Sequence, residues 1–173
     1  AGVAGETSSE MVARFKDDVL ARTPRAVVIW GFINDIFRAP RADAQTALAE
    51  IRANFTDMIA RSQEAGVTVI LATEVTLTHR AGWTNSAMAL VGRLIGKPSY
   101  QDYVNGLVNE TNEWIVRSAR EKNLALLDLA SVVSDGDGRR RRKFAQPDGS
   151  HMTSDAYAAI TRYSRPILER HLG

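Results

Sequence analysis

The spacing with the clearest potential for chemistry in this chain is a carboxylate three positions before an imidazole. Asp148 and His151 stand in the stretch "QPDGSHMTSDAY", with Gly149 between them to permit an unusual turn of the backbone. An aspartate so placed can hold one ring nitrogen and leave the other free as a base. Taken alone, the spacing is common and is also typical of a loop that caps a helix.

Two more positions carry groups suited to stabilising negative charge. Asn34 follows the apolar run "AVVIW" closely, and its amide suits an oxyanion-hole donor, although a turn would use the same residue. Gly5, in "GVAGETS", precedes the expected start of a helix, where a backbone N–H favours an anion. An ordinary loop is the alternative for Gly5.

For several other polar and aromatic residues, the sequence does not decide between a structural and a functional role. His79 and His171 are typical of solvated surface histidines. Glu74 either pairs with an arginine or contacts a substrate. Trp83 either packs against an acyl or sugar group or anchors the core. The run Arg139–Lys143, next to Asp148, is either a solvated loop or an attractor for an anionic substrate or surface.

Short apolar runs alternate with longer amphipathic segments, which predicts a single α/β domain over residues 1–173. Helical crossovers make its strands parallel. The expected strands are 26–30, 67–75 and 124–131, and the expected helices are 8–22, 42–65, 86–95, 100–122 and 154–168. Ligands of such sheets bind beyond the carboxyl ends of the strands, where Asn34, Glu74 and the Asp148–His151 pair all fall.

Composition narrows the class of protein. The chain has 173 residues, of which 45% are hydrophobic and 24% charged, with a net charge of +2, and this is typical of a globular domain. The absence of cysteine excludes disulfides and thiolate metal sites. No apolar run is long enough to predict a membrane-spanning helix. Nucleic acid is not an expected partner, because the charge balance is small and no aromatic platform accompanies the arginine run.

Three blocks in order, Gly-Glu-Thr-Ser at a capped helix, Ile-Asn-Asp after a strand and Asp-x-x-His before the last helix, resemble the SGNH hydrolases, also called GDSL-type esterases and lipases. The resemblance spans nearly the whole chain. It implies a three-layer α/β/α, flavodoxin-like fold with a parallel sheet. It also implies hydrolysis of a small-molecule ester, acyl or acetylated, with no metal or cofactor and no stable membrane insertion.

The resemblance assigns roles to single residues. Gly5 and Asn34 match the two donors of the oxyanion hole, and Asp148 and His151 match the acid and base of a catalytic triad. Phe32 stands where the family usually has glycine, so its ring is expected to line the substrate cleft or to tilt Asn34.

The family's nucleophile lies in a Gly-Asp-Ser motif after the first strand, and this chain lacks that motif. Ser8 and Ser9 are better explained as residues of a helix cap. We therefore expect the N-terminal strands and the serine to lie on a segment outside the sequence or on another chain, so that residues 1–173 alone are inactive. The alternative is a non-catalytic or degenerate α/β ligand-binding module.

Overall fold

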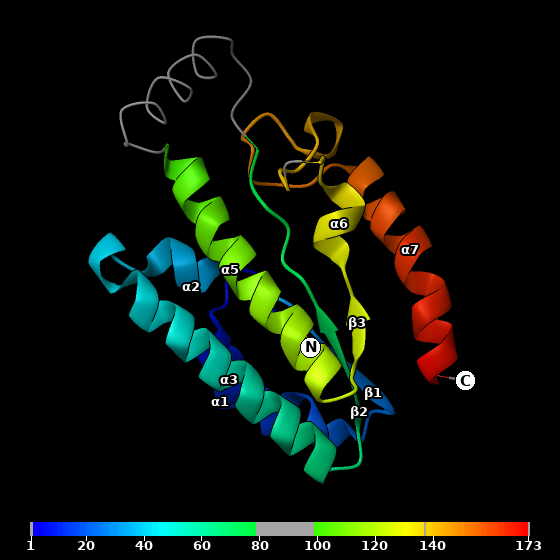
Figure 1. The fold of residues 1–173 in the computed structure, drawn as a ribbon. Helices are drawn as coiled ribbons and strands as arrows, with labels where there is room; N and C mark the ends of the chain where they lie inside the picture. Colours follow the sequence, from blue (N-terminus) through cyan, green and yellow to red (C-terminus); the bar gives the residue numbers. More distant parts are fainter. Residues whose placement is uncertain (1, 79–98, 137, 173) are drawn as a thin grey trace.

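The computed structural model describes residues 2–78, 99–136 and 138–172, and its centre is a parallel sheet of three strands (Figure 1). The strands are β1 (Ala26–Ile29), β2 (Thr68–Ala72) and β3 (Ala125–Leu127), in the order β1-β2-β3. Val28 pairs with Ile70, and Leu71 pairs with Leu126. All three strands therefore end at the same edge of the sheet.

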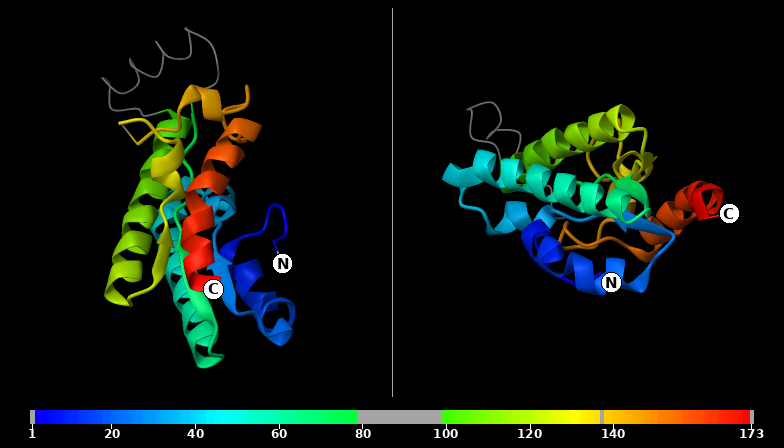
Figure 2. Two further views of the ribbon diagram at one scale, coloured as in Figure 1. Left: turned by 90° about the vertical axis from the view of Figure 1, so that its right-hand side faces the viewer. Right: turned by 90° about the horizontal axis from the view of Figure 1, so that it is seen from below.

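Helices cover both faces of this sheet (Figures 1 and 2). One face carries α1 (Ser8–Asp18), α3 (Ala44–Glu64) and α5 (Tyr100–Glu121). The other carries α6 (Leu129–Val133) and α7 (Ser154–Leu172). The predicted three layers, α/β/α, are thus present. The remaining elements of the described residues are α2 (Ile33–Arg38) and three short 3-10 helices, η1 (Leu20–Arg22), η2 (Arg41–Asp43) and η3 (Arg142–Phe144).

The alternation of side chains along β2 produces two separate cores. Val69 and Leu71 pack under α3 and α5, whereas Ile70 and Ala72 pack toward α6 and α7. All four side chains are at most 3% exposed. The wholly apolar run in the sequence is therefore explained by burial on both faces of the strand.

Three expected elements are shorter than predicted. The first helix stops at Asp18 and continues as η1, the second strand stops at Ala72, and the third strand stops at Leu127. There the Asp128 side chain accepts a hydrogen bond from Ser131 N and starts α6. Apolar periodicity alone did not reveal this cap. The helix expected over 86–95 lies outside the described residues.

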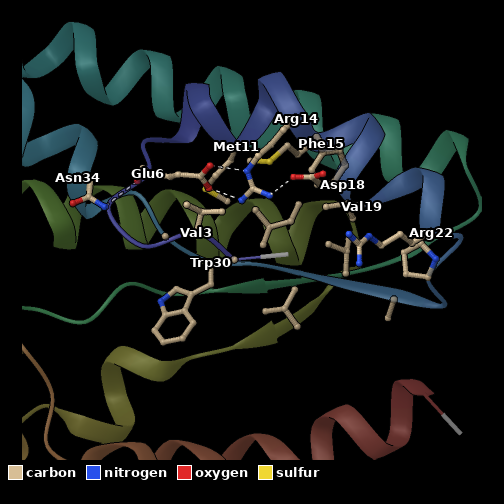
Figure 3. Close-up of a pocket in the computed structure, with 18 residues that line it drawn as sticks. Val3, Glu6, Met11, Arg14, Phe15, Asp18, Val19, Arg22, Trp30 and Asn34 are labelled. Atoms are coloured by element: carbon tan, nitrogen blue, oxygen red, sulfur yellow. Dashed lines mark hydrogen bonds and ion pairs between the residues drawn. The ribbon is translucent and has the colours of Figure 1, made fainter.

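β1 forms one edge of the described sheet, and an open apolar groove flanks it on each face. The α1 groove, of about 460 Å³, lies between α1 and β1 and includes Met11, Phe15 and Val27 (Figure 3). The α7 groove, of about 650 Å³, lies between β1 and α7 and includes Ile160 and Leu168. Val28 lines both grooves and is 41% exposed, unusually high for a strand valine.

Beyond β2 the chain runs on in an extended path that two asparagines of α5 fix in place. Asn112 accepts from Glu74 N at 2.8 Å and donates to Glu74 O at 2.8 Å. Asn105 does the same for Leu77, at 2.7 and 2.9 Å. Seven helical residues rise about 10.5 Å and three extended residues span about 10 Å, so the two spacings match. The amides replace the hydrogen bonds of a neighbouring strand.

Among the residues described, no helix has the length and apolar character needed to cross a membrane.

We predict that Asn112→Leu lowers the free energy of unfolding, measured by urea denaturation. Leucine keeps the volume but leaves Glu74 N–H and C=O buried without partners, at a cost of about 1–3 kcal/mol for each group. Asn109→Leu is the matched control, because Asn109 is an exposed residue on the same helix. Equal urea midpoints for the two variants would show that the clamp does not contribute to stability.

Candidate active site

Asp148 and His151 lie together as a hydrogen-bonded pair. Asp148 Oδ2 lies 2.5 Å from His151 Nδ1. The other carboxylate oxygen accepts from the backbone N–H of Ser150 at 2.8 Å and of His151 at 3.0 Å. The aspartate thus closes a tight turn and holds the imidazole at the same time, while Gly149 within the turn has a φ of +79°.

The pair is open to solvent on the side away from Asp148. The His151 side chain is 75% exposed, and within the described part of the chain no hydrogen bond reaches its Nε2. The backbone N–H of His151, the His151 ring and the N–H of Ser150 together hold the pKa of Asp148 well below its ordinary value. Asp148 therefore stays ionised, and the free Nε2 is placed to exchange a proton with a neighbouring group.

The predicted oxyanion donors also lie close together. Asn34 is in the first turn of α2, and its Nδ2 donates to Glu6 O at 2.9 Å, which places it against the loop that carries Gly5 (Figure 3). Gly5 has a φ of +82°, and its carbonyl accepts from Arg38 at 2.6 Å. An amide nitrogen carries two hydrogens, so the bond to Glu6 orients the second N–H of Asn34.

A cluster of charged residues borders the α1 groove next to these donors. Arg14 lies between Glu6 and Asp18 and is paired with both (Figure 3). Hydrogen bonds to Glu6 and then to Asp18 raise the pKa of Arg14 above its ordinary value. The cluster ties α1 to the loop of residues 5 and 6.

Neither Ser8 nor Ser150 is placed to be activated by His151. Ser8 is fully buried, donates to Asp35 Oδ1 at 2.6 Å and accepts from Asn54 at 2.9 Å. Ser150 Oγ lies 3.5 Å from Nδ1 of His151, the nitrogen already engaged by Asp148. The expectation that Ser8 serves the fold agrees with its burial.

Of the two predicted substrate contacts, Phe32 is buried in the core and Trp83 lies in a part of the chain that is not described. The Phe32 ring is 1% exposed and packs edge-on against Phe55, with centroids 6.1 Å apart. This differs from the expected cleft wall, because the chain turns into α2 at Phe32 and directs the ring into the core. Trp83 and His79 lie outside the described residues.

The arginine run is not a uniformly solvated loop, and this corrects one of the alternatives left open above. Arg140 is 2% exposed, donates from Nε to Thr76 O at 2.7 Å and from Nη2 to Ser150 O at 2.8 Å. Arg139 pairs with Asp102 at 2.9 Å. Five consecutive cations give no indication from sequence of which one is buried.

Glu74, whose role was left open, is also buried and faces Arg140. It is 6% exposed, and Val75 N donates to its Oε1 at 2.9 Å. Burial raises the pKa of Glu74, while hydrogen bonds and the charge of Arg140 act in the opposite direction. Of its two predicted roles, the structure therefore favours the interaction with an arginine.

A scan against protein families matches residues 1–159 to the GDSL-like lipase/acylhydrolase family. The chain therefore belongs to this family, and the resemblance found in its motifs is confirmed. Membership supports ester hydrolysis as the general class of reaction. Among curated proteins, none matches this chain.

Solved structures of low sequence identity share the fold. A GDSL-like lipase from Bacteroides thetaiotaomicron has a TM-score of 0.71 and 19% identity, covering 98% of this chain and 74% of that one. An acetylxylan esterase from Geobacillus stearothermophilus has a TM-score of 0.71 and 19% identity, covering 96% and 69%. A lipase/acylhydrolase from Enterococcus faecalis has a TM-score of 0.62 and 22% identity, covering 96% and 71%. The flavodoxin-like α/β fold with a parallel sheet is thereby confirmed.

We predict that Asp148 titrates below the ordinary aspartate pKa of about 4 in a carbon-detected NMR titration of its carboxyl group. Because its native pKa is depressed, the bonds of the turn contribute stability above the unfolded pKa, and this contribution is lost as the pH falls through the native pKa. His151→Ala should raise the pKa of Asp148 only part of the way, since both backbone N–H donors remain. His171→Ala is the control and should leave it unchanged. An ordinary pKa in the unsubstituted protein would contradict the geometry.

Proposed function

We propose that this chain is the larger part of a serine ester hydrolase whose acid–base pair is Asp148 and His151. The observation that carries the proposal is the orientation of this pair, with Nδ1 held by a carboxylate and Nε2 open, in a chain of the GDSL-like lipase/acylhydrolase family. The substrate is a small-molecule ester, acyl or acetylated. The nucleophilic serine is carried by a segment outside residues 1–173.

The proposed reaction follows from the roles of these groups. His151 Nε2 accepts the proton of the serine hydroxyl as the serine oxygen attacks the carbonyl carbon, and Asp148 stabilises the imidazolium that forms. Gly5 N–H and the second N–H of Asn34 donate to the oxyanion of the tetrahedral intermediate. Collapse expels the alcohol, which takes the proton from His151. Water then cleaves the acyl-enzyme by the same steps.

The outer edge of β1 is the proposed position for the segment that carries the serine. Apolar grooves flank this edge on both faces, and Val28 between them is 41% exposed. The chain covers 69–74% of the three solved structures described above, so those proteins have further residues beyond the shared part. A strand parallel to β1 would end beside Asn34, because parallel strands end at one edge.

We predict that esterase activity differs between residues 1–173 and a full-length protein that also contains the proposed serine segment. The full-length protein should hydrolyse para-nitrophenyl acetate and react covalently with a fluorophosphonate, whereas residues 1–173 alone should do neither. In the full-length protein, His151→Ala should lower kcat at least about 10²–10⁴-fold, and Asn34→Ala about 10²–10³-fold. His171→Ala, on the exposed end of α7, is the control.

Two outcomes would contradict the activity proposal in different ways. Turnover and labelling by residues 1–173 alone would place the nucleophile within this sequence. Neither turnover nor labelling in the full-length protein would favour the non-catalytic ligand-binding module.

We predict that pairing of the proposed strand with β1 can be detected by hydrogen exchange. Backbone amides of Ala26–Ile29 should exchange with deuterium more slowly in the full-length protein than in residues 1–173, because a paired edge is protected. Val28→Lys places a charge between the two apolar grooves and should reverse that protection. Tyr100→Lys is a control at another exposed apolar residue, outside both grooves. Equal exchange in both proteins would contradict pairing at β1.

A further inference from the structure

Glu74 and Arg140 bring two buried, oppositely charged side chains together behind the predicted site. Glu74 follows β2 and is 6% exposed, and Arg140 precedes η3 and is 2% exposed. Their charges interact, although no direct hydrogen bond joins them. Burying two charges is costly unless each gains compensating contacts, so the contacts of each side chain indicate what the pair does.

Arg140 connects the Asp148–His151 turn to the segment that follows β2. Its Nη2 donates to Ser150 O inside the turn, and its Nε donates to Thr76 O. Among the described residues, one backbone–backbone hydrogen bond also joins the turn to this segment, from Thr78 N to Gly149 O at 3.0 Å. The planar guanidinium can hold two carbonyls in a fixed relative position, which an ammonium group on a flexible stem does less well.

Glu74 faces the opposite half of the site. Val75 N donates to its carboxylate, and the nearby backbone N–H of Phe32, two residues before Asn34, and the indole of Trp30 act to lower its pKa. Phe32 is the N-cap residue of α2, so the Glu74 carboxylate lies near the start of the helix that carries Asn34. The carboxylate is therefore near the oxyanion half, whereas Arg140 is hydrogen-bonded to the acid–base half.

Two buried donors show that the cluster does not reach full hydrogen bonding. Trp30 Nε1 and Arg140 Nη1 are both buried near Glu74, and neither has a partner within hydrogen-bond distance. A purely structural core would favour apolar residues over such an arrangement. Polar clusters with incomplete hydrogen bonding call for a specific explanation.

We propose that Glu74 and Arg140 act together as positioning residues, which fix the Asp148–His151 turn relative to the loop that carries Asn34. The expected effect of this positioning on catalysis rests on the proposed function. Its geometric content is independent of that function: the two halves come from segments far apart in sequence, and the described residues show no direct contact between Asn34 and His151.

The first test needs no activity and uses residues 1–173. Arg140→Met removes both bonds to the carbonyls while keeping an apolar stem of similar length. The turn should loosen, so the Asp148 pKa should move up toward its ordinary value and the Thr78 amide should exchange faster with deuterium. Arg140→Lys retains the charge but lacks the planar guanidinium with its several N–H donors, so it should give a partial effect. Arg142→Met is the matched control, since Arg142 is an exposed member of the same run.

The second test uses the full-length enzyme and compares kcat with KM. Arg140→Met and Glu74→Gln should each lower kcat about 10-fold or more while KM changes little, because misplacing catalytic groups affects the reaction more than binding. In double-mutant cycles, Glu74→Gln should be less than additive with Asn34→Ala, and Arg140→Met with His151→Ala. Arg142→Met should leave kcat unchanged.

The outcomes separate the two proposals. An unchanged Asp148 titration, unchanged Thr78 exchange and unchanged kcat in folded Arg140→Met and Glu74→Gln variants would overturn the positioning role. If Arg140→Met does not fold, the comparison between Arg140→Lys and Arg142→Met decides. If the full-length protein hydrolyses no ester, the proposed function fails, while the Asp148 and Thr78 measurements still decide whether Arg140 fixes the turn.

Discussion

The carboxyl edge of this sheet depends on how the backbone after β2 satisfies its hydrogen bonds. Residues 74–77 leave the sheet but remain buried, so their N–H and C=O groups need partners that no neighbouring strand supplies within the described residues. From α5, Asn112 and Asn105 supply those of Glu74 and Leu77, at a helical spacing that matches the extended chain. An unusual path of the main chain thus becomes a rigid support, and the predicted site is attached to it.

Attachment of the Asp148–His151 turn to this support is indirect. The turn itself is closed by Asp148, whose carboxylate accepts two backbone N–H bonds as well as the imidazole. An exposed turn of this kind would move as a unit unless something fixed it to the sheet. The backbone bond from Thr78 and the two carbonyl bonds of Arg140 do so. Precision at a solvated histidine therefore comes from a buried arginine behind it.

Sequence predicted the features that depend on local patterns and missed those that depend on long-range contacts. The buried strands, the capped start of the first helix and the Asp-x-x-His turn were all predictable, because a few adjacent residues determine each. The burial of Phe32 and Arg140 was not. Phe32 turns inward because α2 begins there, and Arg140 is selected from five cations by carbonyls ten and 64 residues away. No local pattern contains that information.

The two sides of the sheet edge differ in a way that matters for the chemistry proposed. Hydrogen bonds and buried side chains fix the groups proposed for the acid–base and oxyanion roles, but β1 beside them has apolar grooves on both faces and an exposed valine between them. A site that needs positions defined to fractions of an ångström cannot tolerate an edge that is free to bind any strand. The site thus requires a covered edge and a precisely placed serine. Pairing of β1 with the strand that carries the serine would provide both, since it would cover the edge and place the hydroxyl beside groups already fixed.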